Sequence, residues 1–303
     1  MKPFQTLLYY CYTPIHDPEA YAATHEAFCR AQGIVGRIII AGEGLNGTVS
    51  GTVVQCKKYQ DFVLSDPRFA QTDFKIDAVD SPSFERLYVR VKPEIVHSGL
   101  REDSGIDPTQ RTGVHLEPQE VLAMLEREDV VFLDVRSNYE NRLGRFKQAV
   151  TLDIDNFRDF PDRLPEIEHL KDKKVVTYCT GGIKCEKASA WLLQNGFGEV
   201  YQVHGGVVKY AQQTGGKDFE GKLYVFDNRV AVDVNTVNPS IISHCACCGE
   251  SSARMVNCAR AACNAHLVQC ERCGWDMQGC CSAECMQDPD KRPYDGSGYY
   301  ARE

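Results

Sequence analysis

The chain has 303 residues, of which 43% are hydrophobic, and it carries a formal net charge of -8 at pH 7. This length is enough for about two or three domains, each with its own core. A chain with this negative charge does not hold nucleic acid by overall electrostatic attraction, so an RNA partner would require a local basic patch.

The N-terminal segment and the cysteine content together predict a reducing compartment. Residues 1–10 lack a long apolar run followed by a cleavage site, and no run of about 18 apolar residues predicts a membrane span. We therefore expect a cytoplasmic protein without a membrane partner. In such a compartment, 15 cysteines are expected to bind metal or take part in catalysis rather than to form disulfides.

Residues 1–96 alternate between strand and helix signals. Asp17 before Pro18 is a favourable helix start, and Gly33 is a favourable helix end. Strands are predicted over residues 6–12, 35–41, 47–51 and 87–91, and helices over residues 18–32 and 54–65. The order β-α-β-β-α-β predicts a ferredoxin-like α+β sandwich.

A glycine-dense segment, residues 41–48, connects two of these strands. Glycine and asparagine tolerate positive φ, so a hairpin turn is the more common structure for such a segment. The alternative is a loop whose backbone approaches a ligand closely. The sequence leaves both interpretations open.

Residues 97–116 are predicted to be a linker because they have no apolar periodicity. Four dipeptides in this segment signal turns: Ser98-Gly99, Ser104-Gly105, Asp107-Pro108 and Thr112-Gly113. His115 precedes the next predicted helix and is assigned no catalytic role.

Residues 117–220 are predicted to form a parallel α/β sheet with helices on both faces, because strands and helices alternate with short connections. The expected strands are residues 130–133, 149–152, 175–178 and 200–203, and the expected helices are residues 119–126, a stretch ending at 170, and 187–193. Cys179 follows the third strand, at the sheet edge where such folds bind ligands.

The loop after this strand carries the candidate chemistry. It consists of Cys179, Thr180, Gly181, Gly182, Ile183, Lys184 and Cys185, and a helix follows. A thiol at a helix N-terminus faces unpaired N–H groups and the positive end of the helix dipole, which favour the reactive thiolate. Cys179 is the predicted nucleophile. Cys185 is either a resolving thiol or a small packed residue.

The loop resembles that of a rhodanese domain, together with Asp134-Val135-Arg136, Glu140 and Gly205-Gly206. The resemblance covers about residues 115 to 215 and implies a loop cysteine that carries a persulfide, surrounded by backbone N–H groups. Rhodaneses usually have arginine where this chain has Lys184. Related phosphatases require Cys-x5-Arg, and the sixth residue after Cys179 is Cys185, so phosphate recognition is not expected.

Asp134 and Arg136 are predicted to form a buried structural pair that connects strand and loop, because buried charges persist only when paired.

The C-terminal segment, residues 221–303, contains a cysteine-rich module over residues 244–285. Its short-spaced pairs are Cys245/Cys248, Cys258/Cys263, Cys270/Cys273 and Cys281/Cys285. Such spacings favour two tetrahedral, structural zinc sites, with the first pair joined to the third and the second to the fourth. The alternative is a cysteine cluster that holds no metal.

The whole chain resembles the bacterial rhodanese-like tRNA uridine(34) hydroxylase family (the TrhO group). The matching segments are residues 36–51, 133–136, 178–183, 185–188 and 225–232, and the cysteine module. The resemblance implies hydroxylation of the wobble uridine in the tRNA anticodon loop to 5-hydroxyuridine, with molecular oxygen as co-substrate. It also implies that Cys179 is the essential thiol and that Lys184 and the loop amides stabilise the anion.

Four basic side chains near the loop are candidates to contact RNA phosphates: Arg142, Arg145, Lys147 and Lys187. Two other functions remain open from the sequence. One is a plain sulfurtransferase that uses a cysteine persulfide, and the other is a binding protein with an inactive rhodanese fold. Nothing in the sequence indicates an oligomeric state.

Overall fold

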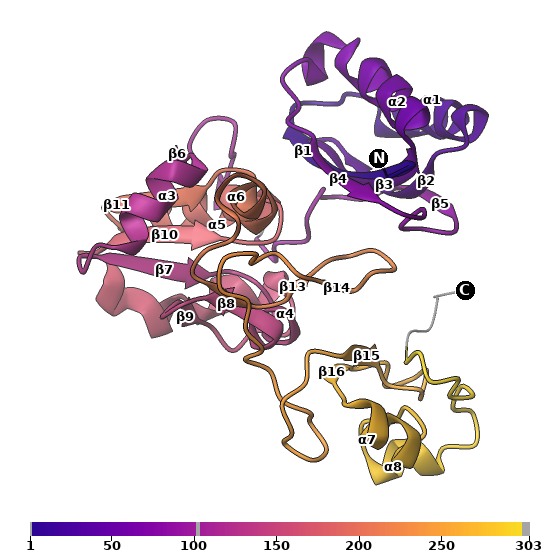
Figure 1. Cartoon of the computed structure of the whole chain (residues 1–303). Helices are drawn as coiled ribbons and strands as arrows, with labels where there is room; N and C mark the ends of the chain where they lie inside the picture. The colour runs from indigo at the N-terminus through magenta and orange to yellow at the C-terminus, as the bar shows by residue number, and fades with distance from the viewer. Residues whose placement is uncertain (1, 101–103, 299–303) are drawn as a thin grey trace.

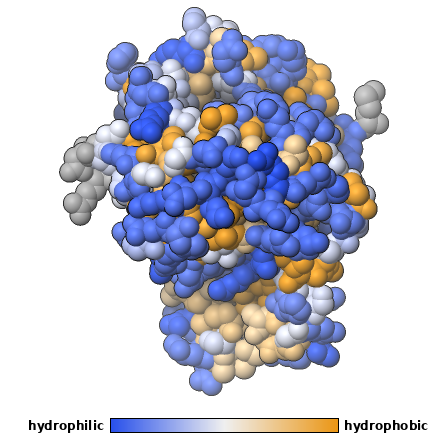
Figure 2. Space-filling view, turned by 90° about the vertical axis from the view of Figure 1, so that its left-hand side faces the viewer, coloured by the Kyte–Doolittle hydropathy of each residue, from blue (hydrophilic) through white to orange (hydrophobic). Residues whose placement is uncertain are grey.

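The computed structural model describes residues 2–100 and 104–298, which form a mixed α/β structure of three domains (Figure 1). Within these ranges, none of the helices combines the length and the apolar character that crossing a membrane requires. On the face in Figure 2, hydrophilic residues cover most of the upper part, and moderately hydrophobic residues gather in the lower part.

The N-terminal domain is the predicted α+β sandwich. Its elements are β1 (Phe4–Tyr12), α1 (Pro18–Gln32), β2 (Val35–Ala41), β3 (Gly44–Thr52), α2 (Val53–Leu64), the 3₁₀ helix η1 (Pro67–Phe69), β4 (Lys75–Val79) and β5 (Leu87–Val91). The sheet order is β4-β1-β3-β2-β5, and all neighbours are antiparallel except β2 and β5.

Two strands of this sheet differ from the prediction. The fourth strand of the sandwich is β4, which the sequence did not reveal because only its two end residues are buried. The predicted strand over residues 87–91 exists, but it is a fifth strand that pairs parallel to β2 at the opposite edge.

The glycine-dense segment is a hairpin, as the more common interpretation predicts. Gly42 and Glu43 form the whole connection, and the remainder of the segment belongs to β2 and β3. The turn brings Glu43 against the central domain, where its carboxylate lies 2.9 Å from the Lys187 ammonium group.

The two faces of the N-terminal sheet have different neighbours, because side chains alternate along a strand. Leu7, Tyr9 and Ile38 pack against α1 and α2 in the domain core. The opposite face, which includes Leu8 and Tyr10, carries no helix of its own domain and is turned toward the rest of the molecule (Figure 1).

The central domain is the predicted parallel sheet, ordered β6-β11-β10-β7-β9. Its elements are β6 (Val114–Leu116), α3 (Pro118–Leu125), β7 (Val130–Asp134), α4 (Asn138–Leu143), β8 (Gly144–Phe146), β9 (Val150–Thr151), the 3₁₀ helix η3 (Phe157–Leu170), β10 (Lys174–Tyr178), α5 (Ile183–Gln194), β11 (Glu199–Val203) and α6 (Gly206–Thr214). One core lies under η3 and α5, and a second lies under α3 and α6, so helices cover both faces.

Two boundaries in this domain differ from the sequence prediction. The edge strand β6 lies within the predicted linker, and it is too short to show periodicity. Helix α5 begins at Ile183 rather than at Lys187, so Lys184 and Cys185 lie in its first turn.

The C-terminal segment first returns to the central domain and then forms the cysteine module. Its elements are β12 (Phe219–Gly221), β13 (Leu223–Tyr224), β14 (Ala231–Val232), β15 (Met255–Asn257), β16 (His266–Val268), α7 (Glu271–Asp276) and α8 (Ala283–Gln287). Strand β12 pairs with β8. Tyr224, Leu143, Met255 and Val268 share an apolar cluster, which joins the module to the central domain.

Candidate active site and metal centres

The candidate active-site loop lies between β10 and α5, and two glycines allow its shape. Gly182 has a φ of +101°, a conformation that residues with a side chain rarely adopt. A Cβ atom on Gly206 would lie 2.5 Å from the Cys179 carbonyl oxygen, so only glycine fits beneath the loop. The Val207 and Val208 N–H groups at the start of α6 donate hydrogen bonds to the carbonyls of Cys179 and Thr180.

Cys179 is 1% exposed, and its surroundings favour the thiolate. The Gly182 N–H group lies 3.2 Å from the Cys179 sulfur. Burial alone would raise the pKa of Cys179, but a hydrogen bond from the Cys185 thiol, the charge of Lys184 and the N–H groups of Lys184 and Gly182 lower that pKa to about 7. Burial is the main reason that the pKa of Cys185 is raised well above its usual value, and the nearby Cys179 sulfur raises it further. Cys179 is therefore the more acidic thiol of the pair.

Lys184 is held at the loop by a buried carboxylate. Its ammonium group lies 2.6 Å from Glu140 Oε2, and Glu140 is completely buried. The Ser137 N–H and Thr180 hydroxyl groups also donate to Glu140, at 3.2 and 3.3 Å. Glu140 therefore fixes both the loop and the positive charge beside Cys179.

Asp134 and Arg136 form a fully buried ion pair at 2.6 Å. The Tyr178 hydroxyl donates to Asp134 at 2.7 Å, and Arg136 donates to the Gly144 carbonyl at 2.7 Å. The pair therefore connects the ends of β7 and β10 to the start of β8.

The N-terminal domain covers the loop. A Cβ atom on Gly181 would lie 2.7 Å from the Leu8 side chain, and one on Gly182 would lie 2.9 Å from the Tyr10 hydroxyl. Leu8 and Tyr10 both belong to the open face of the N-terminal sheet, which is the face that carries no helix of its own domain. Cys179 therefore lies at a domain interface, which no motif in the sequence predicts.

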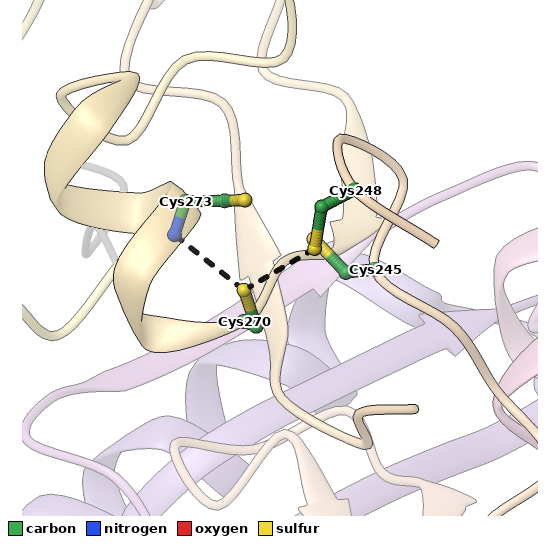
Figure 3. A group of neighbouring side chains, drawn as sticks. All are labelled: Cys245, Cys248, Cys270 and Cys273. Atoms are coloured by element: carbon green, nitrogen blue, oxygen red, sulfur yellow. Dashed lines mark hydrogen bonds between the residues drawn. The ribbon is translucent and has the colours of Figure 1, made fainter. Parts of the chain in front are cut away.

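The eight module cysteines converge in two groups, as the alternate pairing predicts. Each group's sulfur atoms lie within 4.8 Å of one another, and the groups are Cys245, Cys248, Cys270, Cys273 and Cys258, Cys263, Cys281, Cys285. In the first group, drawn in Figure 3, Cys270 caps α7 and lies 3.8 Å from Cys248, sulfur to sulfur. In the second, the sulfur of Cys281 lies 3.7 Å from that of Cys263 and 3.6 Å from that of Cys285. Both groups could hold a metal ion.

Comparison with known protein families accounts for the three domains in order. Residues 4–95 match the UPF0176 acylphosphatase like domain, residues 117–213 the rhodanese-like domain, and residues 220–286 the rhodanase C-terminal domain. A protein of Cytophaga hutchinsonii named tRNA uridine(34) hydroxylase is 62% identical over 303 residues, which is 100% of this chain and 96% of that protein. The chain belongs to the tRNA uridine(34) hydroxylase family.

Other members of the tRNA uridine(34) hydroxylase family are similar over nearly the same length. The protein from Enterococcus faecalis is 45% identical over 95% of this chain and 92% of its own length. The protein from Listeria welshimeri is 46% identical over 95% of this chain and 91% of its own length. The family architecture therefore includes all three domains.

In this member of the tRNA uridine(34) hydroxylase family, Lys187 does not lie where the sequence analysis expected. We predicted that it contacts RNA phosphates, but it is buried and lies 2.9 Å from Glu43 and 2.7 Å from Glu94. Both carboxylates belong to the N-terminal domain, so Lys187 holds the two domains together. The prediction failed because sequence alone does not show which face of α5 a domain covers.

Arg142, Arg145 and Lys147 do remain at least partly exposed. Arg142 and Arg145 line a groove of about 1180 Å³ that includes residues of all three domains. Lys147 is exposed outside the lining of this groove.

This site has a second buried carboxylate, that of Glu186, which was not predicted from the sequence. The Tyr10 hydroxyl lies 2.8 Å from it, His115 Nε2 also lies 2.8 Å away, and the Gln202 amide lies 3.0 Å away. Burial opposes ionisation, but hydrogen bonds and charge from His115, followed by the Tyr10 and Gln202 hydrogen bonds, lower the pKa of Glu186. No local sequence signal identifies this network, because its members come from distant parts of the chain.

Proposed function

We propose that the chain hydroxylates C5 of the wobble uridine in tRNA, with molecular oxygen as co-substrate and Cys179 as the reactive thiol. The observation that carries this proposal is a buried cysteine with a pKa of about 7 in a chain that is similar along its whole length to proteins named tRNA uridine(34) hydroxylase. A tRNA substrate also implies that the enzyme works in the cytoplasm.

Cys179 acts as a nucleophile in this proposal. Addition of its thiolate to C6 of the uracil ring makes C5, the carbon that gains the hydroxyl group, electron-rich. Lys184 and the loop amides hold the thiolate before the reaction and the developing negative charge during it. Thr180, Gly181, Gly182 and Ile183 shape the loop so that these donors face the sulfur.

Cys185 is the resolving thiol. Insertion of one oxygen atom into the C5–H bond leaves the second oxygen atom to be reduced to water, which requires two electrons and two protons. Two thiols release that number when they join in a disulfide, and the Cys185 thiol already contacts Cys179. Uridine, oxygen and two thiols thus give hydroxyuridine, water and one disulfide, which an external thiol then reduces.

Arg142, Arg145 and Lys147 contact phosphates of the anticodon loop. Proteins read RNA most specifically at unpaired bases, and the wobble nucleotide lies in such a loop. Arg142 lies on α4, Arg145 lies on β8, and Lys147 directly follows β8. In the sequence, all three lie within seven residues of Glu140, which holds Lys184. Two of them, Arg142 and Arg145, also line the groove between the three domains.

Each cysteine group of the module holds one structural zinc ion. A Zn–S distance of about 2.3 Å in a tetrahedron places the sulfur atoms about 3.8 Å apart. The sulfur–sulfur distances of 3.6 to 3.8 Å agree with that spacing. Four thiolates leave no open position, so the ions organise the module rather than bind substrate.

The competing function is sulfur transfer, because the Gly182 amide on the Cys179 sulfur also suits a persulfide. Incubation of the protein with unmodified tRNA in air, and separately under nitrogen, distinguishes the two. Mass spectrometry of the nucleosides is expected to show a gain of one oxygen atom at the wobble uridine in air only. A protein that leaves tRNA unchanged and instead transfers sulfur from thiosulfate to a thiol would be a sulfurtransferase.

A further inference from the structure

The groove of about 1180 Å³ is larger than a pocket for one small ligand, which typically has roughly 300 to 1,000 Å³. The N-terminal sheet contributes Arg37, Tyr88 and Arg90 to its lining. Helix α4 and strand β8 contribute Arg142 and Arg145, and the cysteine module contributes His266 among others. An extended polymer segment therefore fits it better than a compact molecule.

The groove concentrates positive charge in a chain with a net charge of -8. Among the residues that the structure describes, no carboxylate forms an ion pair with any of its four arginines, Arg37, Arg90, Arg142 and Arg145. Arg37 and Arg145 donate hydrogen bonds to backbone carbonyls, and Arg90 lies over the Tyr88 ring.

The lining has two acidic residues, and among the described residues only one of them forms an ion pair. Asp227 is paired with Arg229 at 2.6 Å, and Asp155 accepts a hydrogen bond from Asn138 at 3.3 Å. Four guanidinium groups are thus available to an anionic partner.

Strand register connects this groove to the catalytic loop. Across the open face of the N-terminal sheet, Lys75 lies opposite Leu8, and Leu8 lies opposite Thr48. Thr48 in turn lies opposite Arg37, which lies opposite Tyr88. Because partners in register point to the same face, this row extends from Leu8 over the loop to Arg37 and Tyr88 in the groove.

A second cavity, of about 250 Å³, lies along the same row. It is lined by Lys75, Leu8 and Thr48 of the sheet and by Thr180, the residue after Cys179. Phe226 lines both this cavity and the groove. The smaller cavity is near the lower limit of small-ligand pockets, roughly 300 Å³, which suits one unstacked base rather than several.

We infer that the open face of the N-terminal sheet is an RNA-binding surface, on which the groove takes the single-stranded anticodon loop and the smaller cavity takes one unstacked base. The arginines of the groove bind phosphates, and Tyr88 stacks on a base, as aromatic residues on exposed sheet faces do in other RNA-binding domains. The identity of the RNA rests on the proposed function, whereas the binding surface does not require that hydroxylation occurs.

Binding of a fluorescent anticodon stem-loop RNA to the full chain under nitrogen tests this inference. The double variant Arg37→Gln/Arg90→Gln is expected to bind at least tenfold more weakly than the wild type. Each phosphate contact to single-stranded RNA contributes about 0.7 to the salt dependence of log K, so the slope should fall by about 1.4. The variant Tyr88→Leu removes one stacking partner and is expected to weaken binding by roughly fivefold or more.

The matched control is Lys57→Gln/Lys58→Gln, which removes two exposed positive charges from α2, on the other side of the sheet. It should bind within twofold of the wild type. Equal binding by the Arg37/Arg90 variant and the wild type would overturn the inference, even if tRNA is still hydroxylated. If the Arg37/Arg90 variant binds RNA more weakly but the wild type does not hydroxylate tRNA, the RNA-binding surface is supported and the proposed function is refuted. Capture of an acidic peptide in place of RNA would also overturn the inference.

Discussion

The charge of Lys184 is expected to control the reactivity of Cys179. The site lowers the pKa of Cys179 from 9.0 to about 7, and two pKa units correspond to about 2.7 kcal/mol. At pH 7 a thiol with this pKa is about half ionised, whereas one with a pKa of 9 is about 1% ionised. Lys184 supplies part of this effect, so Lys184→Gln should raise the pKa of Cys179. The fraction of Cys179 that is ionised at pH 7 should then fall by about 3- to 50-fold.

Alkylation of Cys179 as a function of pH, followed by mass spectrometry of the peptide that contains it, measures this pKa. The wild type should react half-maximally near pH 7, and the Gln variant at higher pH. Lys184→Arg keeps the charge and should remain close to the wild type. Because Lys184→Gln also leaves the buried Glu140 without its cation, the double variant with Glu140→Gln controls for lost stability. An unchanged midpoint in a folded Gln variant would refute the electrostatic role of Lys184.

Three further predictions concern the RNA contacts, the metal and the domain interface. Arg142→Gln/Arg145→Gln should weaken tRNA binding at least tenfold, measured by filter binding at two salt concentrations, while Arg111→Gln, an exposed arginine outside the groove, should not. Metal analysis should find about two zinc ions per chain, and a chelator should lower the thermal midpoint; less than one ion per chain would contradict the two tetrahedral sites. Gly181→Ala places a methyl group 2.7 Å from Leu8 and should destabilise the chain by about 1 to 3 kcal/mol in urea unfolding, whereas adding Leu8→Ala should cost less than the sum of the single changes. Additive effects would mean that the two domains do not meet there.

Local chemistry explains which parts of the fold could be predicted from the sequence. Helix α1 has the predicted bounds because Asp17 accepts a hydrogen bond from the Ala20 N–H group and Gly33 adopts a left-handed conformation. Strand β6 escaped prediction because three residues are too few to show periodicity. Strand β4 escaped it because its apolar residues Ile76 and Ala78 are exposed while the charged Lys75 is buried. Pairing with neighbours that are remote in sequence stabilises them instead.

In the candidate site too, features set by a short local segment could be predicted, and features set by remote residues could not. The cysteine loop and the cysteine pairs could be predicted because each is a short motif with its own spacing. The contact between Tyr10 and Glu186 joins residues 176 positions apart, and no motif encodes it. Lys187 is an example. Its position near the loop suggested a contact with RNA, but carboxylates of the N-terminal domain, which is remote in sequence, bind it instead.

Hydroxylation of tRNA under heavy oxygen gas by the wild type and by Cys179→Ser tests the proposed reaction most directly. We expect the new hydroxyl group on the wobble uridine to carry the heavy isotope with the wild type, and the serine variant to bind the same tRNA but to give no product. A hydroxyl group that derives its oxygen from water would contradict the use of molecular oxygen, and a serine variant that remains active would contradict the role of Cys179.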